Sequence, residues 1–421
     1  MKKSSTQTAK RAATSPLRAT LLIGLAVVAL PSLASAQPSR SRSSAQPLGI
    51  VFRQIASPDS AVRPLGNRPA LHRGQVAFYG YRGASYGTDV VMAIRRADGK
   101  GAFSILAAEG DPRPDEAGST FDHFGNPALF DGEAVFLGGE FGTLSSTYSA
   151  SISQPYQLFD DRGINNPFFG ALGVTTPASP QGIAYRDPNG VFTFLGLYQD
   201  PLPCGTGSFA YNNVPGLRYV PQGGDLLVWP ALANTSDYAG DLIAGYDTTF
   251  GQLYCVATGL DTIPGLGTPF DFFYKADTDG DRVAFIGMDD TSGFGRHEGV
   301  YVRDASGTGP ITLIADVLTA APGGGTFGSF EAVSIDGDLV IFEGCAGGSG
   351  GCAVYGFFGC FVRNGTPGPI FEILNTGQMI GGRPIIDLTM SPTGRDGNRF
   401  AFDVRHAANS ASLYVATIRV P

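Results

Sequence analysis

The sequence has 421 residues, a formal net charge of −8, 59 Gly and 29 Pro. So many Gly and Pro residues argue against a helical protein and favour an all-β chain with many turns. The net negative charge does not favour binding to nucleic acid or to an anionic membrane surface, so we expect neither as a partner.

Residues 1–36 have the build of a secretory signal peptide. Five basic residues precede an apolar run at 21–34, and Ala34 and Ala36 form a small-x-small site, which predicts cleavage between Ala36 and Gln37. The run is shorter than the roughly 20 residues that cross a bilayer. Cleavage leaves 24 Lys and Arg against 37 Asp and Glu, a net charge of −13. We therefore expect an exported protein, secreted or periplasmic, without a transmembrane span.

After a flexible Ser- and Arg-rich linker at residues 37–47, residues 48–421 form a repeat array. A short apolar stretch ending in an aromatic residue recurs along it. The aromatic residues are Phe78, Phe136, Tyr185, Trp229, Phe285, Phe342 and Phe402. Successive positions lie 44 to 60 residues apart, which is the range of β-propeller blades and related arrays.

A second element keeps register with the first. Gly-rich stretches place Phe121, Phe270 and Phe327 each 15 residues before one of these aromatic residues. In all three copies another Phe follows three residues later. Identical offsets in three places predict one structural unit that is used repeatedly.

Four strands can be predicted in the clearest unit, at residues 270–276, 282–288, 299–303 and 311–315. Within the second strand Val283 and Phe285 point to one face and Ala284 to the other, so both faces are apolar. Blades packed face to face would cover both. We predict a single propeller, most simply of seven four-stranded blades, with six as the alternative because residues 163–205 depart from the repeat.

The two ends of the array complement each other. The last unit contains only three predicted strands, whereas residues 50–55 form a strand that precedes the first unit. We expect this N-terminal strand to pair with the last blade, close the ring and remove a free sheet edge.

The repeat resembles that of a large uncharacterised group of exported bacterial proteins. Their units read approximately Pro-Gly-x-Gly-Thr-Phe, then Gly-x-x-Val-Ala-Phe, then Gly-Val/Ile-Tyr, as at residues 264–270, 283–285 and 299–301 here. The resemblance covers most of residues 48–421. It implies a secreted β-propeller of unassigned activity, and it supplies no catalytic residues to carry over.

The acidic stretch at 277–281 allows two interpretations. Asp277, Asp279 and Asp281 could hold a calcium ion, since hard cations accept clustered carboxylates. The EF-hand template fails, however, because Arg282 and Met288 stand where Gly and Glu are required. Gly280 makes the stretch mainly a hairpin turn. Calcium remains the alternative, and no other cofactor is predicted.

Five cysteines in an exported chain suggest disulfides with one thiol left over. Cys345 and Cys352 flank a glycine-rich loop and could close it. Cys204 and Cys255 are a second candidate pair, which would leave Cys360 unpaired.

One face of the predicted propeller gathers the loops after second strands and the loops that link units. Two literal G-x-S-x-G matches, at 83–87 and 347–351, lack the strand-to-helix context of a hydrolase, so no catalytic residue is predicted. Loops on a rigid scaffold are favoured places for binding, although these side chains could equally be solvated loop residues. The candidate binding residues are Tyr81, Arg82, Tyr86, Asp289, Asp290, Arg296, His297, Arg405 and His406.

The sequence therefore favours an exported, non-catalytic binding or scaffold propeller that recognises a glycan, a peptide or a surface protein. The first alternative is a secreted polysaccharide hydrolase or lyase that uses carboxylates and His on the loop face. The second alternative is a calcium-stabilised structural module.

Overall fold

The structure is a computed structural model, and all of its described residues belong to one compact unit, Gln46–Pro421. It describes residues 49–419 except 67, 114–117, 131–132, 140–145, 152–153, 161–182, 187–191, 196–198, 210–221, 224–225, 236–240, 290–296, 348–351 and 408–409. The predicted signal peptide and the whole predicted linker lie outside the described residues. The described part of the chain contains no helix, and therefore no helix that is long and apolar enough to cross a membrane.

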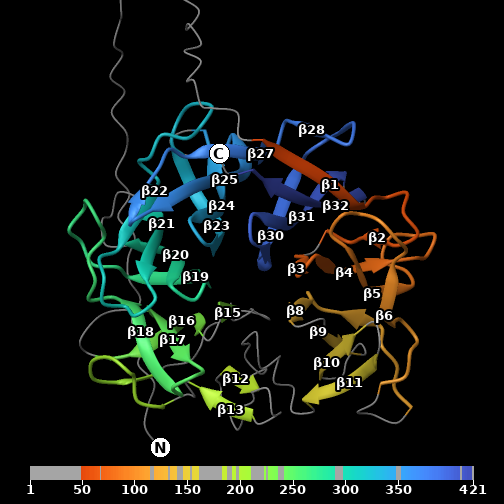
Figure 1. Ribbon diagram of the computed structural model, residues 1–421, viewed down its shortest axis with the longest axis horizontal. Helices are drawn as coiled ribbons and strands as arrows, with labels where there is room; N and C mark the ends of the chain where they lie inside the picture. Colours follow the sequence, from red (N-terminus) through yellow and green to blue (C-terminus); the bar gives the residue numbers. More distant parts are fainter. Residues whose placement is uncertain are drawn as a thin grey trace, which may run out of the picture. The chain divides into compact units, whose positions relative to one another are not determined.

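The described chain is all-β and folds into antiparallel sheets that follow one another in chain order (Figure 1). Sheet 1 contains β2 (Arg63–Pro64), β3 (Ala70–His72), β4 (Gln75–Tyr81), β5 (Val90–Arg96) and β6 (Ser104–Ala108). Sheet 2 contains β7 (His123–Phe124), β8 (Ala128–Phe130), β9 (Glu133–Gly139), β10 (Ser146–Ser151) and β11 (Gln154–Asp160). Sheet 3 contains β12 (Ile183–Arg186) and β13 (Phe192–Leu195).

The second half of the chain repeats this pattern. Sheet 4 contains β14 (Ser208–Phe209), β15 (Gln222–Gly223), β16 (Leu226–Asn234), β17 (Asp241–Asp247) and β18 (Gln252–Thr258). Sheet 5 contains β19 (Phe272–Thr278), β20 (Arg282–Asp289), β21 (His297–Asp304) and β22 (Thr312–Asp316). Sheet 6 contains β23 (Phe327–Asp336), β24 (Leu339–Ala346), β25 (Val354–Arg363), β26 (Thr366–Pro367) and β27 (Phe371–Asn375).

Sheet 7 is built from both ends of the described chain. It contains β30 (Asp387–Asp396), β31 (Arg399–Ala407), β32 (Ser410–Ile418) and β1 (Ile50–Ala56). A separate hairpin of β28 (Met379–Ile380) and β29 (Arg383–Pro384) precedes it. In β1 and β32, Phe52 lies opposite Ala416 and Gln54 opposite Tyr414, and the two strands run side by side in Figure 1.

The four strands predicted for the clearest unit are those of sheet 5, with one shift at the start. Phe270 lies before β19 rather than inside it. Its ring packs instead on Phe273 and Phe285, at centroid distances of 5.0 and 6.2 Å, and Tyr301 stacks on Phe285 at 5.7 Å. The predicted pair of Phe residues thus forms the aromatic centre of the sheet.

Sheet 6 repeats this arrangement. Phe327 and Phe330 pack on each other at 5.3 Å and both contact Phe342 at 5.6 Å, and Phe358 stacks on Phe342 at 5.7 Å. The two units have matching surroundings at matching sequence offsets, as the repeat predicts.

The central strand β20 is buried on both faces. Val283 and Phe285 pack toward sheet 4, whereas Ala284 and Ile286 pack toward sheet 6. Sheets that are apolar on both sides and stack face to face in chain order are the construction of a β-propeller.

The first and last sheets also share an apolar cluster. Val76 and Phe78 of sheet 1 pack against Ala401 and Val415 of sheet 7. Residues at opposite ends of the described chain therefore meet across one interface, and this interface contains the candidate site.

Candidate functional site

Two neighbouring interfaces contain the same kind of hydrogen bond, from a backbone N–H to a carboxylate. Between sheets 4 and 5, the Asp241 carboxylate accepts the Phe273 N–H at 3.4 Å. Between sheets 5 and 6, the Glu298 carboxylate accepts the Phe330 N–H at 2.7 Å. In each sheet the acid lies opposite the neighbouring strand's residue that comes three positions after that strand's central aromatic residue. The two acids therefore occupy the same register position.

The interface between sheets 7 and 1 lacks both partners of this hydrogen bond. Ala411, which lies opposite Arg405, occupies the register position that the acid occupies in the two interfaces above. Pro64, which lies opposite Gly80, occupies the register position from which Phe273 and Phe330 donate their N–H groups in their own sheets. Proline carries no N–H and alanine no acceptor. The hydrogen bond that closes the two other interfaces cannot form here.

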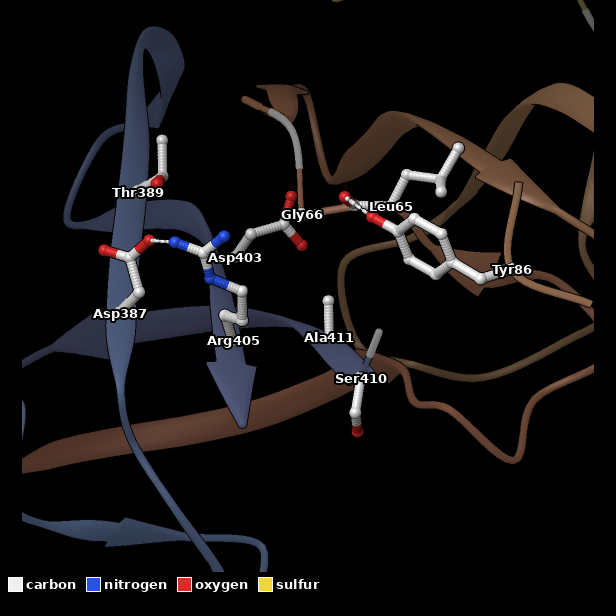
Figure 2. Close-up of a pocket in the computed structure, with 9 residues that line it drawn as sticks. All are labelled: Leu65, Gly66, Tyr86, Asp387, Thr389, Asp403, Arg405, Ser410 and Ala411. Carbon is white, nitrogen blue, oxygen red and sulfur yellow. Dashed lines mark hydrogen bonds and ion pairs between the residues drawn. The ribbon is translucent and has the colours of Figure 1, made fainter. Parts of the chain in front are cut away.

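A cavity of about 150 Å³ lies at this place. Its apolar wall includes Leu65, Gly66 and Ala411, and its polar wall comes from β30, β31 and the start of β32 (Figure 2). The cavity is large enough for several water molecules or for a small ligand group.

The pocket contains an ion pair and a solitary carboxylate. Arg405 pairs with Asp387 across β31 and β30. Asp403 is 3% exposed, and its Oδ1 atom is buried without a hydrogen-bond partner. In Figure 2 its carboxylate points away from the ion pair toward Gly66. Burial raises the pKa of Asp403 well above its ordinary value, because the charged form is poorly solvated there.

Strand alternation explains why Asp403 and Arg405 share the pocket. Ala401 of the same strand packs in the cluster with sheet 1, whereas Phe402 and Val404 pack toward sheet 6. Side chains two residues apart point to one face of a strand. Asp403 and Arg405 therefore follow Ala401 toward sheet 1.

The mouth of the pocket includes the 43%-exposed Tyr86, which sequence analysis singled out. Its hydroxyl donates a hydrogen bond to the Leu65 carbonyl at 3.1 Å, and its ring contacts Tyr81 at 5.4 Å. Tyr81 is buried beneath the Arg63 guanidinium, 4.7 Å from the ring centroid. These contacts fix the loop after β4 over the pocket. Arg82 pairs with Asp89 in the same loop at 2.7 Å.

His406 lies next to Arg405 in sequence but not in the pocket. Its Nδ1 atom is 2.8 Å from the Pro384 carbonyl and its Nε2 atom 3.0 Å from Ser412 Oγ. Ser412 is completely buried, so this Ser–His pair offers no nucleophile to a ligand. Arg405 and His406, predicted together on one face, point to opposite faces of β31.

Asp289 and His297 lie opposite each other at one end of sheet 5. Asp289 is 1% exposed and accepts a hydrogen bond from Thr268 Oγ1 at 2.8 Å. The Nδ1 atom of His297 is buried without a hydrogen-bond partner. Neither residue lines the pocket. The predicted residues Asp290 and Arg296 lie outside the described part of the chain.

The acidic stretch at 277–281 forms a strand end and a hairpin turn. Asp277 is buried and accepts hydrogen bonds from Ser334 Oγ at 2.6 Å and from the Ile335 N–H at 2.8 Å, both in sheet 6. Burial raises its pKa to about 7. Asp279 instead accepts the N–H groups of Asp281 and Arg282 across the turn.

In the part of the chain that the structure describes, no group of three or more His, Cys, Asp or Glu side chains could hold a metal ion. Calcium at Asp277, Asp279 and Asp281 remains a prediction from the sequence. The carboxylates of Asp277 and Asp279 have the partners described above.

Two disulfides are present. Cys345 joins Cys352 with a Cα–Cα distance of 5.3 Å, and Cys204 joins Cys255 at 6.0 Å. Cys360 is free and buried, and burial raises the pKa of its thiol to about 11.

Sequence analysis missed four of the polar pocket residues, namely Asp387, Thr389, Asp403 and Ser410. One local signal was available. Asp403 is an acid inside the otherwise apolar run at residues 400–404, and such a residue is rarely fully buried without a partner. The packing of this strand against residues more than 300 positions away was needed to recognise a pocket there.

No family model matches the chain. No curated protein matches it either. Among solved structures, the β-propeller domain of the Trilobed protease from Pyrococcus furiosus is 13% identical over 85% of this chain and 95% of that one, with a TM-score of 0.46.

Two further structures are similar over much of the chain. TolB from Acinetobacter baumannii is 12% identical over 82% of this chain, with a TM-score of 0.35. One of two prolyl endopeptidases is 12% identical over 87% of it, with a TM-score of 0.43. The chain spans 64% of the TolB structure and 51% of the endopeptidase. Similarity at this level does not bear on activity or ligand.

Proposed function

We propose that this chain is an exported, non-catalytic binding protein whose ligand enters the pocket between sheets 7 and 1. It would be a single propeller of seven blades, with sheet 3 as the blade of which two strands are described. The pairing of β1 with β32 would close its ring. Cleavage between Ala36 and Gln37 would release the mature protein to the periplasm or the medium.

The observation that carries this proposal is the solitary Asp403 carboxylate in a pocket that replaces an interface hydrogen bond. Unpartnered buried carboxylates cost stability, so a protein that keeps one has a reason to keep it. A ligand that donates to Asp403 would supply that reason. Preformed concave sites with a few convergent polar groups are the usual form of small-ligand sites.

Binding rather than catalysis is favoured by the state of the groups around the pocket. The Arg405 guanidinium is paired with Asp387. Both nitrogens of His406 have partners on the far side of β31. Asp403 is the one lining acid without an ion pair among the described residues, and catalysis would need a second acid, base or nucleophile within reach of the same substrate.

Peptide and glycan arrays probed with mature protein, residues 37–421, test the proposal. Two variants, Asp403→Asn and Arg405→Ala, should lose array signals that the unaltered protein gives, while both stay folded and Asp403→Asn, which removes the buried carboxylate, unfolds at an equal or higher temperature. An array pattern that is the same for all three proteins, or no signal at all, would refute a ligand site in this pocket.

A further inference from the structure

The lining of the pocket contains one more acid than it contains bases. Its ionisable lining groups are two carboxylates and one guanidinium, and the guanidinium of Arg405 is taken by Asp387. Asp403 receives no hydrogen bond at Oδ1 and forms no ion pair in the described residues. A buried carboxylate is stabilised by a cation that donates N–H groups to it, and such charge-assisted bonds are the strong ones.

The lining beside Asp403 is suited to the stem of a long basic side chain. Ala411 and the Gly66 backbone supply apolar contact, and the half-exposed Tyr86 also belongs to the lining. Lysine carries a compact ammonium on four methylene groups, and such stems pack along apolar surface while the charge meets its partner. The Thr389 hydroxyl, also in the lining, could accept a further N–H.

Resting on the proposed function, we propose that the ligand is a peptide or protein segment whose lysine side chain enters the pocket and donates its ammonium to Asp403. Tyr86 would lie beside the entering cation, which the face of an aromatic ring attracts. A sugar ring fits this lining less well, because its many hydroxyls would need more free polar partners than Asp403, Thr389 and Ser410 provide.

The test uses small probes and the mature chain. N-acetyl-lysine methylamide should bind about tenfold or more tightly than the norleucine analogue, which has a similar apolar stem and no ammonium. In Asp403→Asn this preference should disappear. In the control Asp338→Asn, which removes an acid that is half exposed and outside the pocket, the preference should stay unchanged.

Equal binding of the lysine and norleucine probes, or a lysine preference that survives in Asp403→Asn, would overturn the inference. So would glucosamine binding more tightly than the lysine probe. The outcome is separable from that of the proposed function. An array ligand that depends on Asp403 but carries no lysine would leave a ligand pocket standing and remove only lysine as its occupant.

Discussion

Asp277 and Asp403 are both buried carboxylates, but they differ in what surrounds them. Asp277 accepts hydrogen bonds from Ser334 and Ile335 of the next sheet, whereas Asp403 Oδ1 accepts none. A carboxylate that accepts hydrogen bonds from the neighbouring sheet, as Asp277 does, holds two sheets together. A carboxylate that faces a cavity without partners is available to a ligand.

The titration of Asp277 should make stability depend on pH. Its pKa in the folded protein, about 7, is above the ordinary value of 3.8, so the folded state binds more protons between these values. Stability is therefore highest below pH 4 as far as this group is concerned, and is lost as the pH rises through 7. In Asp277→Asn, urea unfolding measured from pH 4 to 8 should show a shallower decline. An unchanged decline would mean that other groups cause it.

Glu298 should contribute more to stability than an exposed acid. In Glu298→Ala the buried Phe330 N–H loses its acceptor, which should cost about 2 kcal/mol or more in the free energy of unfolding. In Asp338→Ala, only surface ion pairs at 3.6 and 3.9 Å are lost, and the cost should be below about 1 kcal/mol. Similar costs in chemical denaturation would argue against a structural role for the interface hydrogen bond.

At the scale of strands and loops, the two disulfides should stabilise unequally. Cys204–Cys255 closes a segment with a sequence separation of 51, and Cys345–Cys352 one of only 7. The loss of chain entropy in the unfolded state predicts about 4 kcal/mol for the first and about 2.5 kcal/mol for the second. Double Cys→Ala variants, compared by denaturant unfolding, measure this. A larger loss for the short loop would contradict the entropic account.

The recurring strands could be predicted from the sequence because their signals are local. Phe270, Phe273 and Phe285 have fixed offsets, and the alternation of Val283 and Ala284 sets which face each one meets. The strand pairs and aromatic contacts of sheets 5 and 6 follow these offsets.

The pocket could not be predicted in the same way. Its lining comes from Leu65 and Gly66 near one end of the chain and from Asp403 and Arg405 near the other. The missing interface hydrogen bond is visible only after strand register aligns Pro64 and Ala411 with their counterparts. The prediction grouped Arg405 with His406 because it considered loops, whereas strand alternation separates them.

At the scale of the whole molecule, the pairing of β1 with β32 brings both ends of the described chain to one interface. Without β1, one side of β32 would be an unpaired sheet edge, which invites association with other chains. The same pairing holds sheet 7 in place beside sheet 1, and so it also holds the two walls of the pocket. The last sheet and the candidate binding site therefore depend on a single strand pair.

Residue-resolved amide hydrogen exchange of β32 in the mature protein tests this dependence most directly. Successive N–H groups of an antiparallel strand point to opposite neighbours, so one set faces β31 and the other faces β1. We predict that both sets, between Leu413 and Thr417, exchange as slowly as the amides of the central strand β24. Fast exchange at every second amide of β32 would show that β1 does not close the last sheet, and would contradict the account.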